Sequence, residues 1–291
     1  MKIRYVTSQH SIIGARENDG KQNEDSFFIV QNKIKNGDIA IFAGVADGMG
    51  GLSNGKDASS FITNELENWF NENIETIIKL NKQAFVDMLL AEIRRIHYSL
   101  KNKIKNEWNC SQAGSTLSVL FTRGKSYIIA NIGDSRIYLM QGNEILQLTH
   151  DQTYAQYQID EGIITEKEID VSDKRVHTLM QAMGASDEIA PDLYFGKTDN
   201  FFTFFICSDG MINRVETDEL RRLLIDPDAK SEKEKIVNIM KLAMKRGEND
   251  NLTGIIVKKY DPDNIVQESE GIIPPKKVSI LKESEEPTGK I

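Results

Sequence analysis

Acidic residues stand where apolar, strand-like runs of this sequence begin or end. Two of them follow such runs, two precede them, and a fifth lies between two shorter runs. They are Asp47 and Asp209, Asp25 and Asp250, and Asp134. In an antiparallel sheet the end of one strand lies beside the start of its neighbour. We therefore predict that these carboxylates gather at one edge of a sheet.

Several carboxylates at one place call for a cation, because without one their charges repel and their pKa values rise. Oxygen-rich surroundings without Cys or His favour Mg²⁺ or Mn²⁺. Gly48 and Gly210, which follow two of the acids, leave room for a backbone carbonyl as a further ligand. Two such ions about 3.5 to 4 Å apart can share a hydroxide and neutralise a phosphoryl group under attack. The pattern thus favours phosphoryl hydrolysis without a side-chain nucleophile, although each short motif by itself is a common turn sequence.

The apolar run at 39–46 is predicted to be the second strand of a β-hairpin. Asn36-Gly37 is a strong signal for a two-residue turn. With such a turn Asp25 faces Gly48 and lies one position from Asp47, while a bulge would shift the register by one residue.

Other segments predict the elements that surround the acids. Helical periodicity covers 56–70 and 83–105, with apolar faces suited to a core. Residues 114–148 are typical of short strands separated by glycine-containing turns, so we expect an antiparallel meander. The all-apolar run at 201–207 predicts a buried strand, and a helix is expected from Ser231 to Gly247.

Two segments differ from the rest of the chain. Residues 151–184 look helical and exposed, with Thr165 and Glu168 spaced as a capping box and few apolar residues, so we expect a mobile flap. After Tyr260 the composition is rich in proline and mixed charge. We expect a disordered polar tail at 261–291.

The composition excludes several classes of function. The net charge of -8 argues against a nucleic-acid-binding surface. The sequence has no apolar signal region and no run long enough to span a bilayer, so we expect a cytoplasmic protein without membrane contact. Its two cysteines, Cys110 and Cys207, make neither a disulfide framework nor a zinc site, and Cys207 is expected to be a buried free thiol.

Six motifs occur in an order that resembles the metal-dependent serine/threonine protein phosphatases of type 2C, in their bacterial form. The motifs are "NEDS" at 23–26, "VADGMGG" at 45–51, "GSTL" at 114–117, "NIGDSR" at 131–136, "CSDG" at 207–210 and "NDNLT" at 249–253. The resemblance covers residues 1–260. It implies an α+β fold, a sandwich of two antiparallel β-sheets flanked by pairs of α-helices.

The resemblance also implies roles for individual residues. Asp47 bridges two Mn²⁺ or Mg²⁺ ions, Asp209 and Asp250 complete the first, and Glu24 or Asp25 with the Gly48 carbonyl holds the second. A metal-bridging water or hydroxide is then the nucleophile. Asp134 helps to bind a third, weaker ion beside Asp209. The substrates are phosphoproteins of a serine/threonine kinase in a signalling pathway, the flap touches them, and the protein is expected to be a monomer.

The phosphate anchor departs from the family pattern. Family members place an Arg five residues before the Asp of "NEDS", where this chain has Gly20. The two candidates are Arg16, if "DGKQ" is an insertion, and Lys21. Met49 stands where eukaryotic relatives have a His, so metal-bound water would protonate the leaving group.

Two rival functions stay open on the sequence alone. One is a catalytically inactive phosphatase fold that serves as a binding module, because a fold does not fix a function. The other is a two-metal hydrolase of a small phosphomonoester. The presence of the core acids favours an active protein phosphatase over both.

Overall fold

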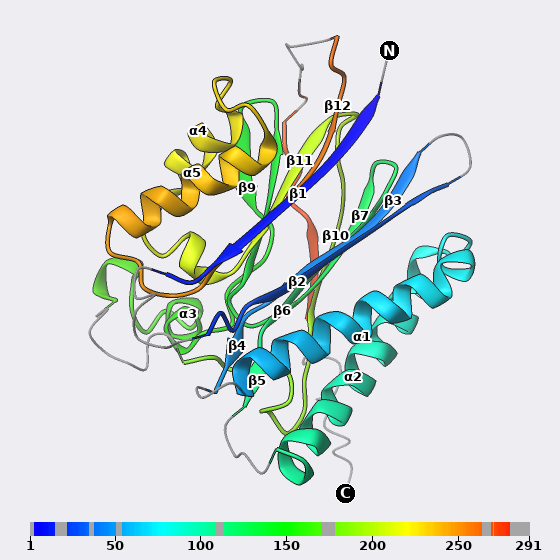
Figure 1. The fold of residues 1–291 in the computed structure, drawn as a ribbon, viewed down its shortest axis with the longest axis vertical. Coiled ribbons are helices and arrows are strands. Elements are labelled where there is room, and N and C mark those ends of the chain that lie inside the picture. Colours follow the sequence, from blue (N-terminus) through cyan, green and yellow to red (C-terminus); the bar gives the residue numbers. More distant parts are fainter. Residues whose placement is uncertain are drawn as a thin grey trace, which may run out of the picture.

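Two antiparallel β-sheets packed face to face form the centre of the molecule (Figure 1). The computed structural model describes residues 3–14, 22–34, 38–50, 54–108, 113–169, 178–263, 269 and 271–279. The predicted α+β sandwich is confirmed within these residues.

The larger sheet has six strands in the order β13-β10-β7-β6-β3-β2. Their bounds are β2 Ser26–Lys33, β3 Ile39–Ala46, β6 Leu117–Arg123, β7 Ser126–Ile132, β10 Asp192–Lys197 and β13 Lys276–Ser279. Seven of the eight residues of β3 are buried, as the apolar run predicted. A strand buried on both faces is held firmly, which matters because Asp47 follows it directly.

The smaller sheet has five strands in the order β1-β12-β11-β8-β9. Their bounds are β1 Arg4–Ile12, β8 Arg136–Gln141, β9 Glu144–Gln147, β11 Phe202–Cys207 and β12 Leu252–Tyr260. The short strands β4 (Gly48–Met49) and β5 (Gly114–Ser115) pair separately at one end of the sandwich. Of these strands, β1 was not predicted.

Helices cover the outer face of each sheet (Figure 1). The pair α1 (Asn54–Ile77) and α2 (Lys82–Asn106) packs on the six-stranded sheet, and α4 (Thr217–Ile225) with α5 (Glu232–Lys245) packs on the five-stranded sheet. The helix α1 is longer than the predicted 56–70, and α4 was not predicted. Helix α5 begins after Ser231, whose side chain accepts a hydrogen bond from the backbone N–H of Glu234, as expected. The short α3 (Tyr154–Asp160) lies apart from both pairs.

Three apolar layers fill the sandwich. One lies between the sheets, around side chains such as Phe204 and Ile129, and the others lie beneath the two helix pairs. Phe42 and Phe70 stack at 4.6 Å between β3 and α1. Within the described residues no helix is long and apolar enough to cross a membrane.

The predicted meander at 114–148 is divided between the two sheets, which corrects the expectation. Strand β7 pairs with β6 and β10, whereas β8 pairs with β11 and β9. The chain crosses at Gly133, whose φ of +93° is open to glycine but strained for other residues. A Cβ atom there would lie 2.7 Å from the Thr116 side chain. Asp134 therefore lies at the crossing between the sheets.

The register of the β2–β3 hairpin differs by one residue from the prediction. Ser26 pairs with Ala46, so the next residues on the two strands are Asp25 and Asp47. The backbone N–H of Ile34 donates to the Asp38 carbonyl at 2.9 Å. Three residues therefore connect the strands instead of two, and Asn36 and Gly37 lie outside the described residues.

The segment after Tyr260 is partly ordered, against the expectation of a disordered tail. Strand β13 joins the edge of the six-stranded sheet, and its register pairs Lys276 with Phe195 and Ser279 with Asp192. The Ser279 hydroxyl also donates to the Asp192 carboxylate at 2.7 Å. A strand of four residues is too short to show the 2-residue periodicity that predicts a strand, so no pattern in the sequence marked it.

Candidate metal centre

Hydrogen bonds to its backbone hold Asp47 in place at the end of β3. Its N–H donates to the Thr116 hydroxyl at 2.9 Å, and its carbonyl accepts from the Thr116 N–H at 2.9 Å and the Ser115 hydroxyl at 2.8 Å. These bonds use the backbone groups and leave the carboxylate to point elsewhere. Its side chain is partly exposed, although the strand before it is buried.

Asp25 lies beside Asp47 and is almost fully buried. The Ser208 hydroxyl donates to Asp25 Oδ2 at 2.8 Å, and Thr253 supplies a second side-chain hydrogen bond. Ser208 belongs to the segment that follows β11, and Thr253 lies on β12. Both partners belong to the five-stranded sheet, whereas Asp25 directly precedes β2 of the six-stranded sheet, so these bonds join the two sheets.

Asp209 begins a short 3-10 helix, Asp209–Met211, directly after Ser208. The Asn213 side chain donates to Asp209 Oδ2 at 3.1 Å. A Cβ atom on the following Gly210 would lie 2.2 Å from the Asn251 carbonyl oxygen. Backbone therefore packs closely against Gly210, which brings Asp209 next to the loop before β12, while a role of its carbonyl as a metal ligand stays a prediction.

Asp250 lies in that loop and is exposed. Its N–H donates to the Glu248 carboxylate at 2.9 Å, and its own Oδ1 accepts from the Asn251 N–H at 2.8 Å. The Asn251 side chain in turn accepts from the Glu24 N–H at 2.8 Å. The loop at 248–251 is thus joined to the residues just before β2.

Gly48 and Glu24 pack against the start of α1. The Gly48 N–H donates to the Glu24 carbonyl at 3.2 Å, and a Cβ atom on Gly48 would lie 2.1 Å from the Gly55 carbonyl oxygen. A Cβ atom on Gly55 would lie 2.5 Å from Glu24 Oε1. At Gly48 no other residue type fits without moving backbone, whereas at Gly55 an added atom would first displace the Glu24 side chain.

Asp134 lies beside a turn that holds the start of the predicted flap. The Gly133 N–H donates to the Gln152 side chain at 2.9 Å, and Arg136 forms a bidentate pair with Asp151, with Nε to Oδ1 at 2.8 Å and an NH2 group to Oδ2 at 2.7 Å. Planar bidentate pairs of this kind fix orientation as well as charge. The Arg136 guanidinium also lowers the pKa of Asp134, but less than burial and Asp209 raise it.

The electrostatics place Asp47 at the centre of the acids. Burial raises its pKa well above the usual range, and the charges of the other four aspartates raise it further. We call the five residues Asp25, Asp47, Asp134, Asp209 and Asp250 the aspartate cluster. The prediction that they come together is in accord with these mutual interactions.

Two further members of the cluster have raised pKa values. Burial raises the pKa of Asp25 to about 7, opposed by the hydrogen bonds from Thr253 and Ser208 and supported by the charges of Asp209 and Asp250. Burial, and then the charge of Asp250, raise the pKa of Asp209 to about 6. Such carboxylates gain from any cation that lies between them.

The cluster fits a hard divalent cation. Among the described residues, Asp25 Oδ1 and Asp209 Oδ1 are buried oxygens without a hydrogen-bond partner, and a cation is the kind of ligand that such atoms accept. No three Asp, Glu, His or Cys side chains in the same residues are drawn together closely enough to hold one ion by themselves. Like charges repel unless a cation lies between them, and Mg²⁺ usually keeps several water ligands besides its carboxylates. The number of ions stays a prediction.

A cleft of about 230 Å³ lies beside Asp134 and Asp209. Helix α3 forms one wall with Ala155, Gln156 and Ile159, and Asn213 lies on the opposite side. The Arg136–Asp151 pair also lines it. The lining of the cleft thus combines the two aspartates with apolar side chains of α3 such as Ala155 and Ile159.

Both ends of the predicted flap are joined by hydrogen bonds to segments that hold the aspartate cluster. The Met180 N–H donates to the Gln152 carbonyl at 2.8 Å, and Met183 exchanges backbone hydrogen bonds with Ser115. Ser115 also binds the carbonyl of Asp47. The capping box at Thr165 is present, but the element it starts is a 3-10 helix, Glu166–Glu168. The mobility of the flap stays a prediction.

Arg16 and Lys21 lie outside the described residues. Gly14, two residues before Arg16, packs so tightly on the loop at 249–250 that a Cβ atom there would lie 2.2 Å from the Asp250 carbonyl oxygen. Gly14, the last described residue before Arg16, therefore lies next to the cluster. Which of the two cations anchors phosphate stays a prediction.

Sequence reasoning missed the hydroxyl and amide side chains that position the acids, namely Ser208, Thr253, Thr116, Ser115, Asn251 and Asn213. Five of them, all except Asn213, belong to the motifs already recognised, so a signal was present. They are polar residues at the buried ends of strands, and such residues need partners. Cys207, by contrast, is the buried free thiol that was expected.

Comparison with known proteins identifies one family. Residues 14–242 match the family model described as Protein phosphatase 2C. The serine/threonine phosphatase stp of Listeria welshimeri is 30% identical over 237 residues, which cover 81% of this chain and 90% of that protein.

Solved structures agree with this result. A serine/threonine phosphatase from Staphylococcus aureus is 27% identical, with a TM-score of 0.73 over 86% of this chain and 93% of its own. The catalytic domain of the phosphatase PstP, in complex with 2 manganese ions, is 25% identical, with a TM-score of 0.72 over 89% of this chain and 100% of its own.

The two-sheet sandwich is thus shared with serine/threonine phosphatases. The chain belongs to the protein phosphatase 2C family, and it is a hydrolase of the protein phosphatase class.

Proposed function

We propose that this protein hydrolyses phosphoserine and phosphothreonine in proteins, with two Mn²⁺ or Mg²⁺ ions bound at the aspartate cluster. The observation that supports this most directly is the pair of buried, unpartnered carboxylate oxygens on Asp25 and Asp209, set around the central Asp47. A relative of known structure carries two manganese ions, which is in accord with the proposed ion count.

Each residue has a definite task in the proposal. Asp47 would be a ligand of both ions, Asp209 and Asp250 would complete the first, and Asp25 or Glu24 with the Gly48 carbonyl would hold the second. Asp134 would hold a third, weaker ion. When bound, the ions supply the positive charge that offsets the phosphoryl oxygens and make an attacking hydroxide available at neutral pH. The chain itself supplies orientation, because the backbone of Asp47 and the carboxylate of Asp25 are each fixed by two or more hydrogen bonds.

Substrate recognition is assigned to the cleft beside Asp134. A phosphorylated side chain placed at the cluster leaves the flanking peptide against α3 and Asn213, which line the cleft. A small phosphomonoester would have no use for this surface. The cleft therefore favours protein substrates over the small-molecule alternative, and the intact cluster favours an enzyme over an inactive binding module.

The test is hydrolysis of a phosphothreonine peptide with Mn²⁺, with Mg²⁺ and with excess chelator. We expect turnover with either metal, none with chelator, and none in Asp209→Asn. Asp228→Asn, at an exposed aspartate far from the cluster in sequence, is the matched control and should keep full activity. Full activity in chelator would contradict the metal mechanism, and a preference for a free phosphorylated metabolite over the peptide would favour the small-molecule reading.

The substrates' kinase, the monomeric state, a role in signalling and the cytoplasmic location stay predictions. Each rests on the family resemblance or on composition. Size-exclusion chromatography with light scattering would test the monomer directly.

A further inference from the structure

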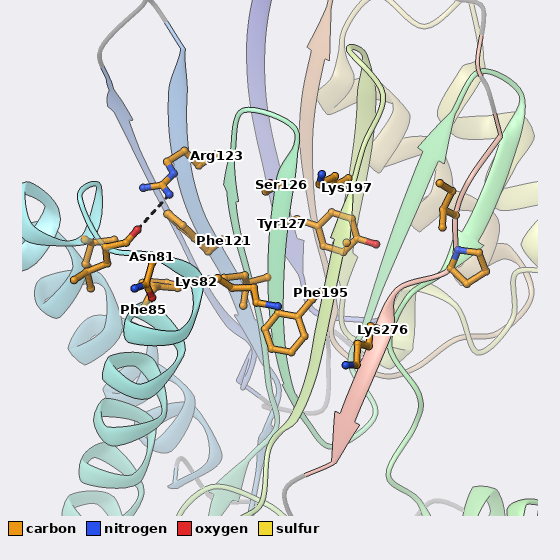
Figure 2. Close-up of a pocket in the computed structure, with 16 residues that line it drawn as sticks. Asn81, Lys82, Phe85, Phe121, Arg123, Ser126, Tyr127, Phe195, Lys197 and Lys276 are labelled. Carbon is orange, nitrogen blue, oxygen red and sulfur yellow. Dashed lines mark hydrogen bonds between the residues drawn. The ribbon is translucent and has the colours of Figure 1, made fainter.

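A second cavity lies at the other end of the six-stranded sheet from the aspartate cluster. It has a volume of about 510 Å³ and is formed where the start of α2, the outer faces of β7 and β10, and the segment leading into β13 meet (Figure 2). On β7, the cavity is lined by Ser126, Tyr127 and Ile128, whereas the opposite end of the same strand leads to Gly133 and Asp134. The cavity is therefore separate from the proposed active site.

The floor of the cavity is apolar and largely aromatic. Phe85, Phe121 and Phe195 line it, and the rings of Phe85 and Phe121 lie 4.3 Å apart. In Figure 2 the Phe195 ring lies in the middle of the cavity, with Phe85 and Phe121 at one side. An apolar floor of this size buries the body of a small ligand well, because ligand cavities range from roughly 300 to 1,000 Å³.

The rim of the cavity carries only positive charge. Lys82, Lys197, Lys276 and Arg123 line it, and no carboxylate does. Within the described residues the three lysines form no ion pair with an acid. Arg123 is partly committed, because it donates to the carbonyls of Ile78 and Leu80. In a protein with a net charge of -8, a cavity lining with four cations and no acid is a local reversal of sign.

The position of one lysine joins the rim to the floor. The Lys82 ammonium lies over the Phe195 ring, 4.5 Å from its centroid. It also stands at the first position of α2, whose first-turn N–H groups carry partial positive charge. An anionic group bound beside Lys82 would therefore gain from the ammonium and from the helix end while its apolar body rests on Phe195.

We propose that this cavity binds an amphipathic anion, a molecule with a compact apolar body and a single carboxylate or phosphate at one end. Charge complementarity selects an anion, and the floor selects an apolar body. A nucleotide is a poor fit, because its ribose and base need several neutral hydrogen-bond partners, whereas the neutral polar side chains of the lining are those of Asn81, Ser126 and Tyr127. The Asn81 side chain is already used as the cap of α2, where it accepts from the Ala84 N–H.

Calorimetric titration of the full chain with two carboxylates tests the proposal and shows which kind of apolar body the cavity prefers. Decanoate has an acyl body, and 1-naphthoate has an aromatic one. We expect at least one to bind, and the tighter one identifies the body that the floor prefers. Decyltrimethylammonium, with the same chain and the opposite charge, should bind at least roughly ten-fold more weakly because it faces like charges.

The variant that removes the proposed contacts is Lys82→Gln/Lys197→Gln/Lys276→Gln. Its affinity for the bound carboxylate should fall by roughly ten-fold or more, and the wild-type affinity should weaken as salt is added. Lys230→Gln/Lys241→Gln/Lys245→Gln, with three exposed lysines on or beside α5, is the matched control and should bind as the wild type does. Phosphatase activity should be unchanged in both, which shows that the variants are folded and keeps this test apart from that of the proposed function.

Three results would overturn the proposal. One is equal binding of decanoate and decyltrimethylammonium. Another is an unchanged affinity in the triple variant. The third is binding to anionic phosphatidylglycerol vesicles with no binding of either free carboxylate, which would make the lysines part of a surface instead of a ligand cavity.

Discussion

The Ser208 hydroxyl donates a hydrogen bond to the buried carboxylate of Asp25, 2.8 Å away, and accepts one from the Thr253 N–H at 3.1 Å. Ser208 directly follows β11 and Asp25 directly precedes β2, so the contact joins the two sheets at the metal centre. A hydrogen bond to the ionised form of a buried acid favours ionisation. Ser208 thus helps to keep Asp25 able to bind a cation.

Ser208→Ala is expected to weaken Mn²⁺ binding. The loss of a donor raises the pKa of Asp25 further, and the lost bond is worth roughly 1 kcal/mol, so the apparent dissociation constant should rise by about five-fold at neutral pH. The effect should be larger at pH 6.5 than at pH 8.5, because protonation of Asp25 competes more strongly with Mn²⁺ binding at the lower pH. Titration of Mn²⁺ at both pH values measures this, and an equal loss at the two would show that Ser208 acts only through packing.

The metal-free protein is expected to lose stability as the pH rises. The pKa values of Asp25 and Asp209 are raised in the folded state to about 7 and about 6, so the folded state binds more protons than the unfolded one. The free energy of unfolding then falls between the unfolded pKa, about 4, and the folded values near 7. Melting temperatures in chelator between pH 4.5 and pH 8 should show this decline.

Asp47→Asn supplies the control for that measurement. It removes the central charge, so the decline with pH should be smaller and the metal-free protein at pH 7.5 should be at least as stable as the wild type. Turnover should be lost. A large drop in the melting temperature of this variant would mean that Asp47 is needed for folding instead.

Gly48→Ala is expected to abolish activity. The new Cβ atom would lie 2.1 Å from the Gly55 carbonyl oxygen and 2.6 Å from the Glu24 carbonyl oxygen, and both are backbone atoms that cannot rotate away. The start of α1 must shift, and Glu24 and the Gly48 carbonyl shift with it. Peptide hydrolysis and Mn²⁺ titration should both show losses of roughly 100-fold or more, as displacement of catalytic groups by about 1 Å typically does.

Gly162→Ala is the comparison for Gly48→Ala. Its φ of +67° makes the substitution strained, but nothing lies within 4 Å of the added atom. It should lower the melting temperature while the activity of the folded enzyme is retained. If both variants lost activity to the same degree, close packing at Gly48 would not be the reason.

Arg16→Ala is expected to lower kcat/KM for a phosphopeptide by roughly ten-fold or more, the loss of a charge-assisted contact worth about 1.5 to 3 kcal/mol. A guanidinium matches a phosphoryl group in a bidentate manner, which an ammonium cannot do. Lys21→Ala should therefore have the smaller effect. If Lys21→Ala is the more damaging and Arg16→Ala is silent, Lys21 is the anchor; if both are silent, the metals alone hold the phosphate.

The sequence by itself determined the acids and the family. Asp47 could be found because β3 is a short, wholly apolar run, and burial on both faces leaves such a pattern. Asp25, Asp209 and Asp250 could be found in the same way, because each lies where an apolar run begins or ends. Helix α5 was predictable for a similar reason, since its cap residue Ser231 acts within one turn.

Only the tertiary structure decided the contacts between distant segments. The register that puts Asp25 next to Asp47 depends on the length of a connection, and one residue more changes every partner. The split between β7 and β8 depends on which sheet each strand joins, which local periodicity does not record. The Ser208–Asp25 bond and the cationic cavity around Phe195 likewise join residues far apart in the chain, and no short-range pattern encodes such neighbours.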